Sequence, residues 1–446
     1  MNIGPHCNNR SRTFKRLGSP GLNMGFRDLV DGIRTVKDPI SVNYDMKIAS
    51  ESSGNQPLLF NEIIESHGQR AVTNILTRHR LCEAFDVEPG ELIDILSWAM
   101  ENPCDTVPVD PGSAPVLENR MAHTDISILP IPWHYREDGG RYQSSSIIIA
   151  QYGGQRNTSF HRQLLKGPDR TTVRLVPRHL RTMADRAYEN NEDVPIAVVN
   201  GPDPLVLLAA AMSFNEPIDE LRVASALHER LYGVKLGLVE LPNGVQVPAE
   251  SEYAMEARIT TKLDDEGPYV DITGTVDDIR QEPVIEYDSI YHRNEPIFHA
   301  LIPAGVEHMT LMGMPRAPTI KTAVSEVVTC TDVYLTDGGS GWLSSVVQIV
   351  PENSGDSMRA IRAALDGHKS MKQVIVVDTD IDVANSTRVE WALMTRWQPD
   401  KDTLILSDQK GSSLDPSRSP EGTTSKIGFD ATIEPGADRT PFESVL

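Results

Sequence analysis

The spacing of apolar residues divides the chain into three segments that predict different structure. The first, residues 24–115, mixes helical spacing with short apolar runs and ends where four prolines crowd into residues 103–115. Clustered prolines interrupt helices and strands, so this interval indicates a domain boundary. Helices are expected over 61–67, 71–85 and 91–101.

The second segment, residues 116–322, is dominated by short apolar and β-branched runs, several of them closed by glycine or proline. Such runs predict strands, and longer stretches of helical spacing predict helices between them. This mixture suggests a barrel or sandwich decorated by helices. Strands are expected over 145–151, 171–176, 194–199, 234–241, 245–248 and 252–262, and helices after Pro177 and over 204–212 and 219–231.

The third segment, residues 323–446, alternates strands with helices, which is typical of an α/β domain with a mostly parallel sheet. The predicted fold class is therefore mixed α/β (α+β), with an N-terminal domain over 24–115, a central domain over 116–322, and a C-terminal α/β domain and tail over 323–446. Strands are expected over 325–335, 344–350 and 374–377, and helices over 357–365 and 389–395.

Residues 1–23 are basic and rich in Asn, Ser and Arg, without an acid or an apolar run. A secretory signal needs such an apolar run. We expect a disordered tail or an upstream extension, with Met24 as the natural start. A transit peptide is the alternative.

Charge and cysteine content narrow the class of protein. The chain carries 42 Lys and Arg against 63 Asp and Glu, a formal net charge of −21. Nucleic acid is excluded as an expected partner, because phosphate backbones are bound by basic surfaces. The four cysteines lack the spacing of zinc sites, which favours a reducing cytoplasm. The longest apolar runs are too short to span a bilayer.

Against this acidic background, cations concentrate in residues 156–162 and 177–181, which hold four arginines and two histidines. They predict a bound anion. Asn157, His179 and Glu220 add oxygen and nitrogen ligands that suit Mn²⁺ or Mg²⁺ beside that anion. Spacing alone supports this weakly, since Glu220 near a helix start could simply favour the helix dipole and His179 could be a surface residue.

Two acids, Glu266 and Asp271, flank a Gly-Pro turn. A tight turn can aim both side chains into one cavity with Arg162 between them. Pairing would keep one carboxylate ionised, while burial could make the other a proton donor. A solvated acidic turn is the alternative. The residues alone favour it, because two further aspartates directly precede Glu266.

Asp378, Asp380 and Asp382 follow an apolar strand. They could bind a cation, end the strand in solvent, or cap the next element. The Gly-Gly-Ser-Gly stretch at 338–341 lacks the Lys-Ser/Thr of a phosphate-binding loop, so we predict no nucleotide site there.

Several ordered segments together resemble the UbiD family of decarboxylases. The resemblance extends from about residue 118 to residue 432 and more loosely through the N-terminal part. Its segments are Asn157-Thr158-Ser159-Phe160-His161-Arg162, Val176-Pro177-Arg178-His179-Leu180, Val247-Pro248-Ala249-Glu250-Ser251-Glu252, Glu266-Gly267-Pro268-Tyr269, Asp380-Ile381-Asp382-Val383 and Ser425-Lys426-Ile427-Gly428-Phe429-Asp430-Ala431-Thr432.

The resemblance implies a prenylated flavin mononucleotide (prenyl-FMN) held through its phosphate by Mn²⁺ or Mg²⁺, with K⁺ nearby. By position, the implied metal ligands are Asn157, His179 and Glu220, and the implied catalytic residues are Arg162, Glu266 and Asp271. A central split β-barrel flanked by α/β domains is the implied fold, with the C-terminal domain serving oligomerisation. The implied cofactor-binding residues are Asn157, Thr158, Ser159, Phe160, His161, Arg162, Arg178, His179, Glu220 and Lys369.

The implied reaction is non-oxidative decarboxylation of an α,β-unsaturated carboxylic acid by a cytoplasmic homo-oligomer supplied with cofactor by a flavin prenyltransferase. The compact length resembles archaeal members. These imply trans-anhydromevalonate 5-phosphate as substrate and isopentenyl phosphate as product, within the mevalonate pathway of isoprene biosynthesis. A phosphorylated substrate needs further cations, for which Arg293, Arg316 and Lys321 are candidates.

Other functions remain open at this point. A polyprenyl-hydroxybenzoate or another aromatic acid is the alternative substrate. A flavin reductase-type oxidoreductase and a non-catalytic flavin-binding module are alternatives of other classes. One departure from the family also matters: Val270 stands where glycine is usual. A β-branched residue disfavours positive φ, so Val270 could change the aim of Asp271.

Overall fold

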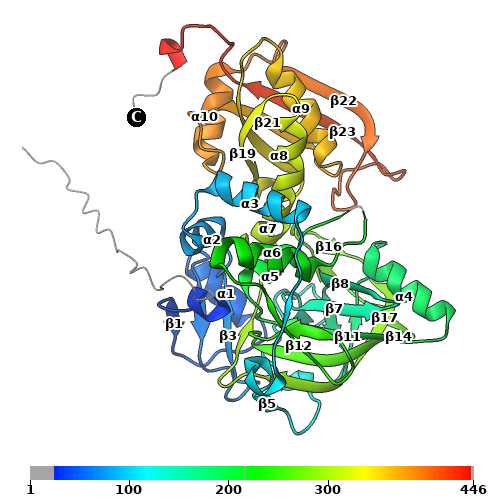
Figure 1. Cartoon of the computed structure of the whole chain (residues 1–446). Helices are drawn as coiled ribbons and strands as arrows, with labels where there is room; N and C mark the ends of the chain where they lie inside the picture. Colours follow the sequence, from blue (N-terminus) through cyan, green and yellow to red (C-terminus); the bar gives the residue numbers. More distant parts are fainter. Residues whose placement is uncertain (1–24, 215, 443–446) are drawn as a thin grey trace, which may run out of the picture.

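The computed structural model describes residues 25–214 and 216–442 and confirms the mixed α/β fold class. The predicted tail over residues 1–23 lies outside the described residues. Figure 1 shows a C-terminal part with its own sheet above the other sheets. Helices α3 (Pro89–Glu101) and α7 (Val306–Gly313) lie between the two parts.

The N-terminal part contains a four-stranded sheet in the order β1-β2-β3-β18. Strand β18 comes from much later in the chain and pairs in parallel with β3. The sheet is therefore completed by a strand outside residues 24–115. Its elements and neighbours are η1 (Phe26–Leu29), β1 (Arg34–Val36), α1 (Asp45–Ser52), β2 (Leu58–Phe60), β3 (Arg70–Thr73), α2 (Arg78–Phe85) and β18 (Ile297–His299).

The central sheet follows the order β6-β9-β10-β17-β14-β11-β7-β8, with β5 also paired to β17. Among the described strands this path starts at β6 and ends at β8, so the pairing forms an open sheet; a closed barrel is not shown. The strands are β5 (Asn119–Arg120), β6 (Tyr142–Gln143), β7 (Ile147–Tyr152), β8 (Gln155–Phe160), β9 (Gln163–Leu165), β10 (Arg170–Val173), β11 (Val194–Asn200), β14 (Tyr253–Glu266) and β17 (Arg280–His292).

Both faces of the central sheet are buried. Along β7, Ile147 and Ile149 join an apolar cluster with helices α5 (Pro204–Ala210) and α6 (Glu220–Tyr232). Ile148 joins a second cluster with α4 (His179–Glu189). Because successive side chains of a strand point to opposite faces, a strand buried on both sides reads as a continuous apolar run. This explains the isoleucine run at the start of β7.

Smaller elements complete the central part. Strand β12 pairs with β13 and with β4, which again joins residues far apart in the sequence. The remaining elements are β4 (Val107–Pro108), η2 (Pro111–Ser113), η3 (Pro115–Leu117), η4 (Ile126–Ile128), β12 (Gly237–Glu240), β13 (Gln246–Pro248), β15 (Tyr269–Val270) and β16 (Val276–Asp277).

The C-terminal sheet has the order β19-β20-β21-β23-β22. Its central pairs are parallel and its two edge pairs antiparallel, which refines the prediction of a mostly parallel sheet. The elements are η5 (Met314–Arg316), α8 (Ala317–Ser325), β19 (Thr329–Leu335), η6 (Asp337–Gly339), β20 (Ser344–Val350), α9 (Asp356–Gly367), β21 (Gln373–Asp378), α10 (Ser386–Arg396), β22 (Thr403–Lys410), β23 (Thr423–Ala431) and η7 (Thr440–Phe442).

Two helix predictions in the N-terminal part are wrong. Residues 61–67 form no helix, because backbone groups of Glu62 and Ile64 hydrogen-bond to Ile40 instead. The helix expected over 71–85 begins only at Arg78. The residues before it form β3, which is held between β2 and β18. Tertiary pairing thus overrides the local helical spacing.

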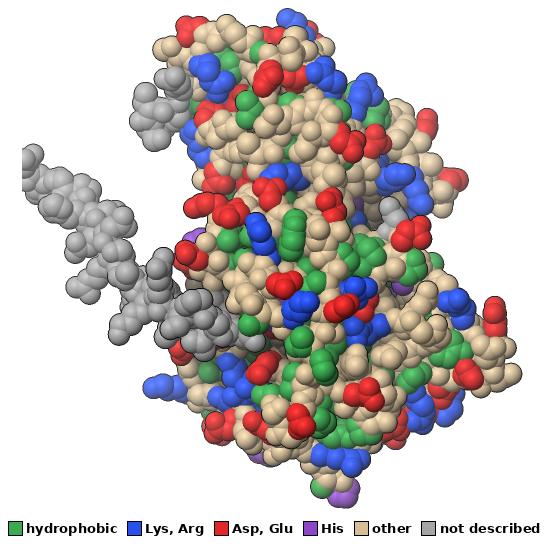
Figure 2. Space-filling view, viewed as in Figure 1, with side chains coloured by type: hydrophobic (Ala, Val, Ile, Leu, Met, Phe, Trp, Pro, Cys, Tyr) green, Lys and Arg blue, Asp and Glu red, His purple; other side chains and the backbone are tan. Residues whose placement is uncertain are grey.

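Within the described residues, no helix is both long and apolar enough to cross a membrane. On the face drawn in Figure 2, acidic and basic side chains are interspersed.

Candidate functional site

Arg162 lies between β8 and β9 and donates hydrogen bonds to three carboxylates. Its Nε and Nη2 donate to the two oxygens of Glu266, each at 2.9 Å. Its Nη1 donates to Asp271 Oδ2 at 2.9 Å, and Nη2 also donates to Asp277 Oδ2 at 2.8 Å. The guanidinium lies over the ring of Tyr269, 4.5 Å from its centroid. The two acids and the arginine predicted to meet are therefore in contact.

The carboxylates keep Arg162 charged. Burial alone would lower its pKa, but hydrogen bonds and charge from Glu266, with further charge from Asp271, raise the pKa above its usual value. Burial alone would raise the pKa of Asp277, but hydrogen bonds from Arg280 and Arg162 lower it to about 2. Arg162 and Asp277 are thus both ionised at neutral pH.

Glu266 and Asp271 differ in their surroundings. The Glu266 side chain is fully buried and also accepts a hydrogen bond from the Tyr142 hydroxyl at 3.1 Å. The Asp271 side chain is 25% exposed, and among the described residues its Oδ1 accepts only from the backbone N–H of Ile272 at 2.7 Å. Glu266 is held from several sides, whereas Asp271 keeps access to solvent.

The turn between β14 and β15 brings these acids together. Gly267 has φ +103°, and a Cβ at this position would lie 2.8 Å from the carbonyl oxygen of Asp278. Only glycine suits such a backbone at such close approach. Val270 lies in β15, and its backbone N–H donates to Asp138 Oδ1 at 2.8 Å. Val270 is not among the residues with positive φ, and Asp271 contacts Arg162 in this arrangement.

Asn157 and Glu220 contact each other directly. Strand β8 presents Asn157, whose Nδ2 donates to Glu220 Oε1 at 2.9 Å, and the N–H of Thr158 donates to Oε2 at 2.7 Å. Glu220 is the first residue of α6, whose N-cap is Asp219. Burial raises the pKa of Glu220 to about 8. No cationic side chain of the described residues pairs with this carboxylate.

His161 extends this polar network. Its Nδ1 lies 3.0 Å from the Arg174 carbonyl oxygen, which can only accept, so Nδ1 carries the proton. Burial lowers the pKa of His161 to about 4, so the ring is neutral and Nε2 accepts from the Ser159 hydroxyl, 2.9 Å away. The Ser159 hydroxyl also lies 2.9 Å from Asn157 Oδ1, to which it can donate. Because an amide oxygen has two lone pairs, Asn157 Oδ1 retains a free one.

The remaining predicted residues are less closely connected. His179 begins α4, and among the described residues it hydrogen-bonds to neither Asn157 nor Glu220. Its neighbour Arg178 donates to the Ser213 hydroxyl. The Lys369 side chain is exposed after α9, and its carbonyl accepts from Lys426 Nζ at 2.6 Å. In the described ranges, no group of three His, Cys, Asp or Glu side chains is placed to hold a metal.

Arg396 pairs with the two aspartates at and just after the end of β21. Arg396 donates to Asp378 at 3.0 Å and to Asp380 at 2.5 Å, while Asp382 accepts from the backbone N–H of Ala384. The cation they bind is therefore a guanidinium, and Asp382 caps a turn.

Three neighbours of the site were missed by sequence reasoning. Asp277 pairs with Tyr269 across β15 and β16, so a hairpin prediction for 269–277 would have found it. Tyr142 offered no local signal. His308 lies on α7. Burial lowers its pKa below the usual value, although the negative charge of Asp271 acts to raise it. Its Nδ1 accepts from the Ala304 N–H at 3.2 Å.

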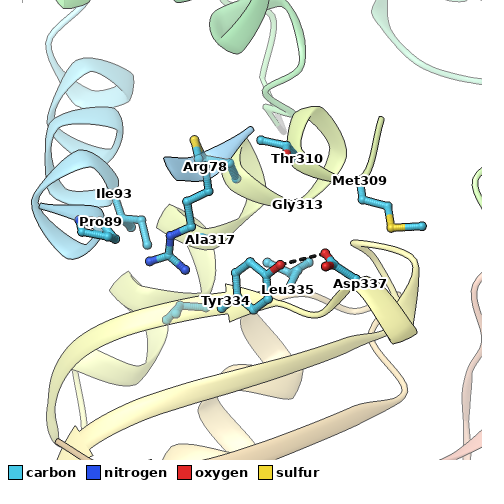
Figure 3. A pocket seen from close by; sticks show the side chains of 12 residues that line it. Arg78, Pro89, Ile93, Met309, Thr310, Gly313, Ala317, Tyr334, Leu335 and Asp337 are labelled. Atoms are coloured by element: carbon cyan, nitrogen blue, oxygen red, sulfur yellow. Dashed lines mark hydrogen bonds between the residues drawn. The ribbon is translucent and has the colours of Figure 1, made fainter. Parts of the chain in front are cut away.

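A separate pocket lies between α3, α7 and β19 (Figure 3). Arg78 donates to both oxygens of Asp332 at 2.7 Å and lies over the Tyr334 ring. The Tyr334 hydroxyl donates to Asp337 at 2.7 Å. None of the predicted site residues lines this pocket, which instead marks where the N-terminal helices meet the C-terminal sheet.

Comparisons with known proteins agree with this architecture. The family model described as the 3-octaprenyl-4-hydroxybenzoate carboxy-lyase Rift-related domain matches residues 107–306, and that of the C-terminal domain matches residues 309–431. The anhydromevalonate phosphate decarboxylase of Methanosarcina mazei is 39% identical over 92% of this chain and 96% of its own length. That of Methanocaldococcus jannaschii is also 39% identical, over 85% and 90%.

Solved structures give the same result. The UbiD-class enzyme HmfF from Pelotomaculum thermopropionicum in complex with FMN has a TM-score of 0.89 and 32% identity, covering 95% of this chain and 97% of that one. An evolved dimeric form of HmfF in complex with prFMN has a TM-score of 0.84 and 30% identity, covering 93% and 96%. With both family models matched over most of its length and with relatives of this similarity, the chain belongs to the UbiD family of decarboxylases.

Proposed function

We propose that this decarboxylase uses prenylated FMN to convert trans-anhydromevalonate 5-phosphate to isopentenyl phosphate and CO₂. The observation that supports the chemistry most directly is the Arg162 guanidinium shared by Glu266 and Asp271. Support for the substrate comes from the archaeal relatives named anhydromevalonate phosphate decarboxylase, two of them 39% identical.

The protein's own contribution is charge placement and proton delivery. Arg162 binds the substrate carboxylate and keeps the two acids in place. When the bond between this carboxylate and the adjacent carbon breaks, CO₂ leaves and that carbon must gain a proton. Asp271 delivers the proton, because it is the acid with solvent access and the fewer contacts. Buried Glu266 holds Arg162 in position.

Bound prenylated FMN would supply the electron sink for the pair released with CO₂. The residues that would hold the cofactor are Asn157, Thr158, Ser159, Phe160, His161, Arg162, Arg178, His179, Glu220 and Lys369. HmfF bound to FMN and to prFMN supports a flavin in this fold.

A divalent cation fits beside Asn157 and Glu220. Glu220 is a buried carboxylate with no cationic partner among the described side chains, and the amide oxygen of Asn157 retains a free lone pair beside its contact with Ser159. Carboxylate and amide oxygens are hard ligands that suit Mn²⁺ or Mg²⁺. We propose that His179, at the start of α4, completes this set, and that K⁺ binds nearby.

Supply and assembly are part of the same proposal. A flavin prenyltransferase would provide the cofactor, and the active enzyme would be a homo-oligomer. A dimeric form is known for the evolved HmfF.

The direct test is co-expression with a flavin prenyltransferase, followed by mass spectrometry of the small molecules released from the protein. We expect prenylated FMN with a divalent metal, and CO₂ release from trans-anhydromevalonate 5-phosphate. A metal-replete preparation without modified flavin would contradict the cofactor. A flavin-loaded enzyme inactive on this acid but active on aromatic acids would contradict the substrate.

A further inference from the structure

Three cations were candidates for binding the phosphate of a phosphorylated substrate, and the structure separates them. Arg293 lies 3.5 Å from buried Glu252 and donates to the Glu250 carbonyl. Lys321 is 2.6 Å from Asp94 and donates to the Gly90 carbonyl. Both charges are therefore used within the fold. Arg316 forms no ion pair with any carboxylate of the described residues.

Arg316 also differs from other arginines that are similarly enclosed. Burial lowers the pKa of Arg80 and of Arg141 as well, but each donates to backbone carbonyls. Arg80 donates to Ile75 and Leu29, and Arg141 to Ile131, Ser127 and Leu129. In the described part of the chain, the Arg316 guanidinium has no such acceptor. It stacks on Trp342, 5.3 Å from the ring centroid.

The charge that acts on Arg316 is that of another cation. Burial, then the charge of Arg178, lowers the pKa of Arg316 to about 10. His368 packs on the same Trp342 ring at 4.4 Å, and its Nε2 donates to the Trp342 carbonyl at 3.0 Å. The charge of Arg178 thus acts on Arg316, and no carboxylate of the described residues pairs with Arg316, in a chain of net charge −21. A partly desolvated cation without a partner is costly, so this arrangement calls for a bound anion.

The position of Arg316 relates that anion to the decarboxylation site. Burial lowers the pKa of His308, near the start of α7, and the negative charge of Asp271 acts to raise it. Arg316 follows eight residues later, at the end of η5. Helical rise separates these two residues by about 12 Å. The carboxyl carbon and phosphorus of anhydromevalonate phosphate are six bonds of about 1.5 Å apart. The two lengths are of the same order.

We propose that Arg316, stacked on Trp342 without an acidic partner among the described residues, binds the phosphate monoester of the substrate and makes the enzyme selective for a phosphorylated acid. This rests on the proposed function and extends it to a specificity residue. The cofactor also carries a phosphate monoester, so the test must distinguish the two sources.

The experiment compares Arg316→Gln with the wild-type holoenzyme on trans-anhydromevalonate 5-phosphate and on its dephosphorylated alcohol. We expect KM for the phosphorylated acid to rise about 10- to 100-fold, because a charge-assisted contact is lost, while kinetics on the alcohol stay unchanged. Arg316→Lys should recover part of the preference. Arg388→Gln is the matched control, since Arg388 also stacks on a tryptophan, Trp391 at 4.4 Å, but on α10.

Each contrary result has a separate meaning. Equal losses on both compounds would make Arg316 structural, and loss of bound flavin from Arg316→Gln would assign it to the cofactor; either overturns the inference. If the wild type decarboxylates neither compound, the proposed function fails, and calorimetry with inorganic phosphate decides about Arg316. If the wild type binds inorganic phosphate and Arg316→Gln does not, the anion site is still supported. If the wild type binds no phosphate, or if both proteins bind it equally, the anion site is contradicted.

Discussion

At the scale of single residues, Asp271 and Glu266 both accept hydrogen bonds from the Arg162 guanidinium but differ in solvent exposure. Asp271 is the acid whose side chain is accessible to solvent. We therefore expect Asp271→Asn to lose proton delivery while keeping the hydrogen bond from Arg162 through its amide oxygen. General acid catalysis is worth roughly 10²- to 10⁴-fold, so kcat should fall by that order, with flavin content unchanged. Steady-state CO₂ release measures kcat, and flavin absorbance measures the flavin content.

The control for this variant is Asp278→Asn, which removes a nearby charge from an exposed side chain. It should behave as the wild type. Full activity in Asp271→Asn would assign proton delivery to another group.

A second residue-scale prediction concerns pH. Burial raises the pKa of Asp138 to about 6, against 3.8 normally, although its oxygens accept from Val270 and Tyr135 N–H groups. The folded protein therefore binds this proton more tightly than the unfolded chain does. The free energy of unfolding should fall as pH rises from about 4 to about 6, by up to about 3 kcal/mol from this group.

Urea denaturation at several pH values measures this dependence. Asp138→Asn should flatten the curve over the same window. A wild-type curve that rises there, with the same slope in the variant, would contradict the assignment to Asp138.

At the scale of elements, the β14–β15 turn sets the distance between the two acids. Gly267→Ala adds a Cβ 2.8 Å from the Asp278 carbonyl at a φ of +103°. We expect a loss of about 1–3 kcal/mol in stability, together with reduced activity as the acids separate. Thermal unfolding and CO₂ release report the two effects.

Gly274→Ala is the matched variant. Gly274 has φ +72° with nothing within 4 Å of the added Cβ, so it should lose only roughly 1 kcal/mol and keep its activity. Equal effects in the two variants would show that close packing at Gly267 is unimportant.

Local patterns predicted elements well where local forces dominate. Helices α3, α4, α6 and α9 have apolar faces that can be read from the sequence, and Asp219, the first residue of the helix expected over 219–231, is the N-cap of α6. Strand β3 was missed because its partners, β2 and β18, cannot be seen in its own residues.

The site shows the same division. The residues around Glu266 predicted either a solvated turn or a buried pair, and the family resemblance, not the spacing, favoured the pair. Burial by Tyr142, which comes from a strand more than a hundred residues earlier, depends on tertiary structure. No local pattern encodes it.

At the scale of the whole molecule, contacts between distant segments hold the two parts together. Arg78 of α2 binds Asp332 of β19. Glu307 of α7 accepts from the backbone N–H groups of Asn74 and Leu76 and from His299. These contacts join the N-terminal sheet to the helix that carries His308. Helix α7 is thus held in place by residues more than 200 positions earlier in the chain.

The late arrival of β18 has a consequence for biosynthesis. During translation, β1, β2 and β3 leave the ribosome with one edge of β3 unpaired until residues 297–299 emerge. At about 5–20 residues per second, this edge stays open for roughly ten seconds or longer. An open strand edge templates intermolecular pairing, so the nascent N-terminal part is exposed to such pairing during this interval.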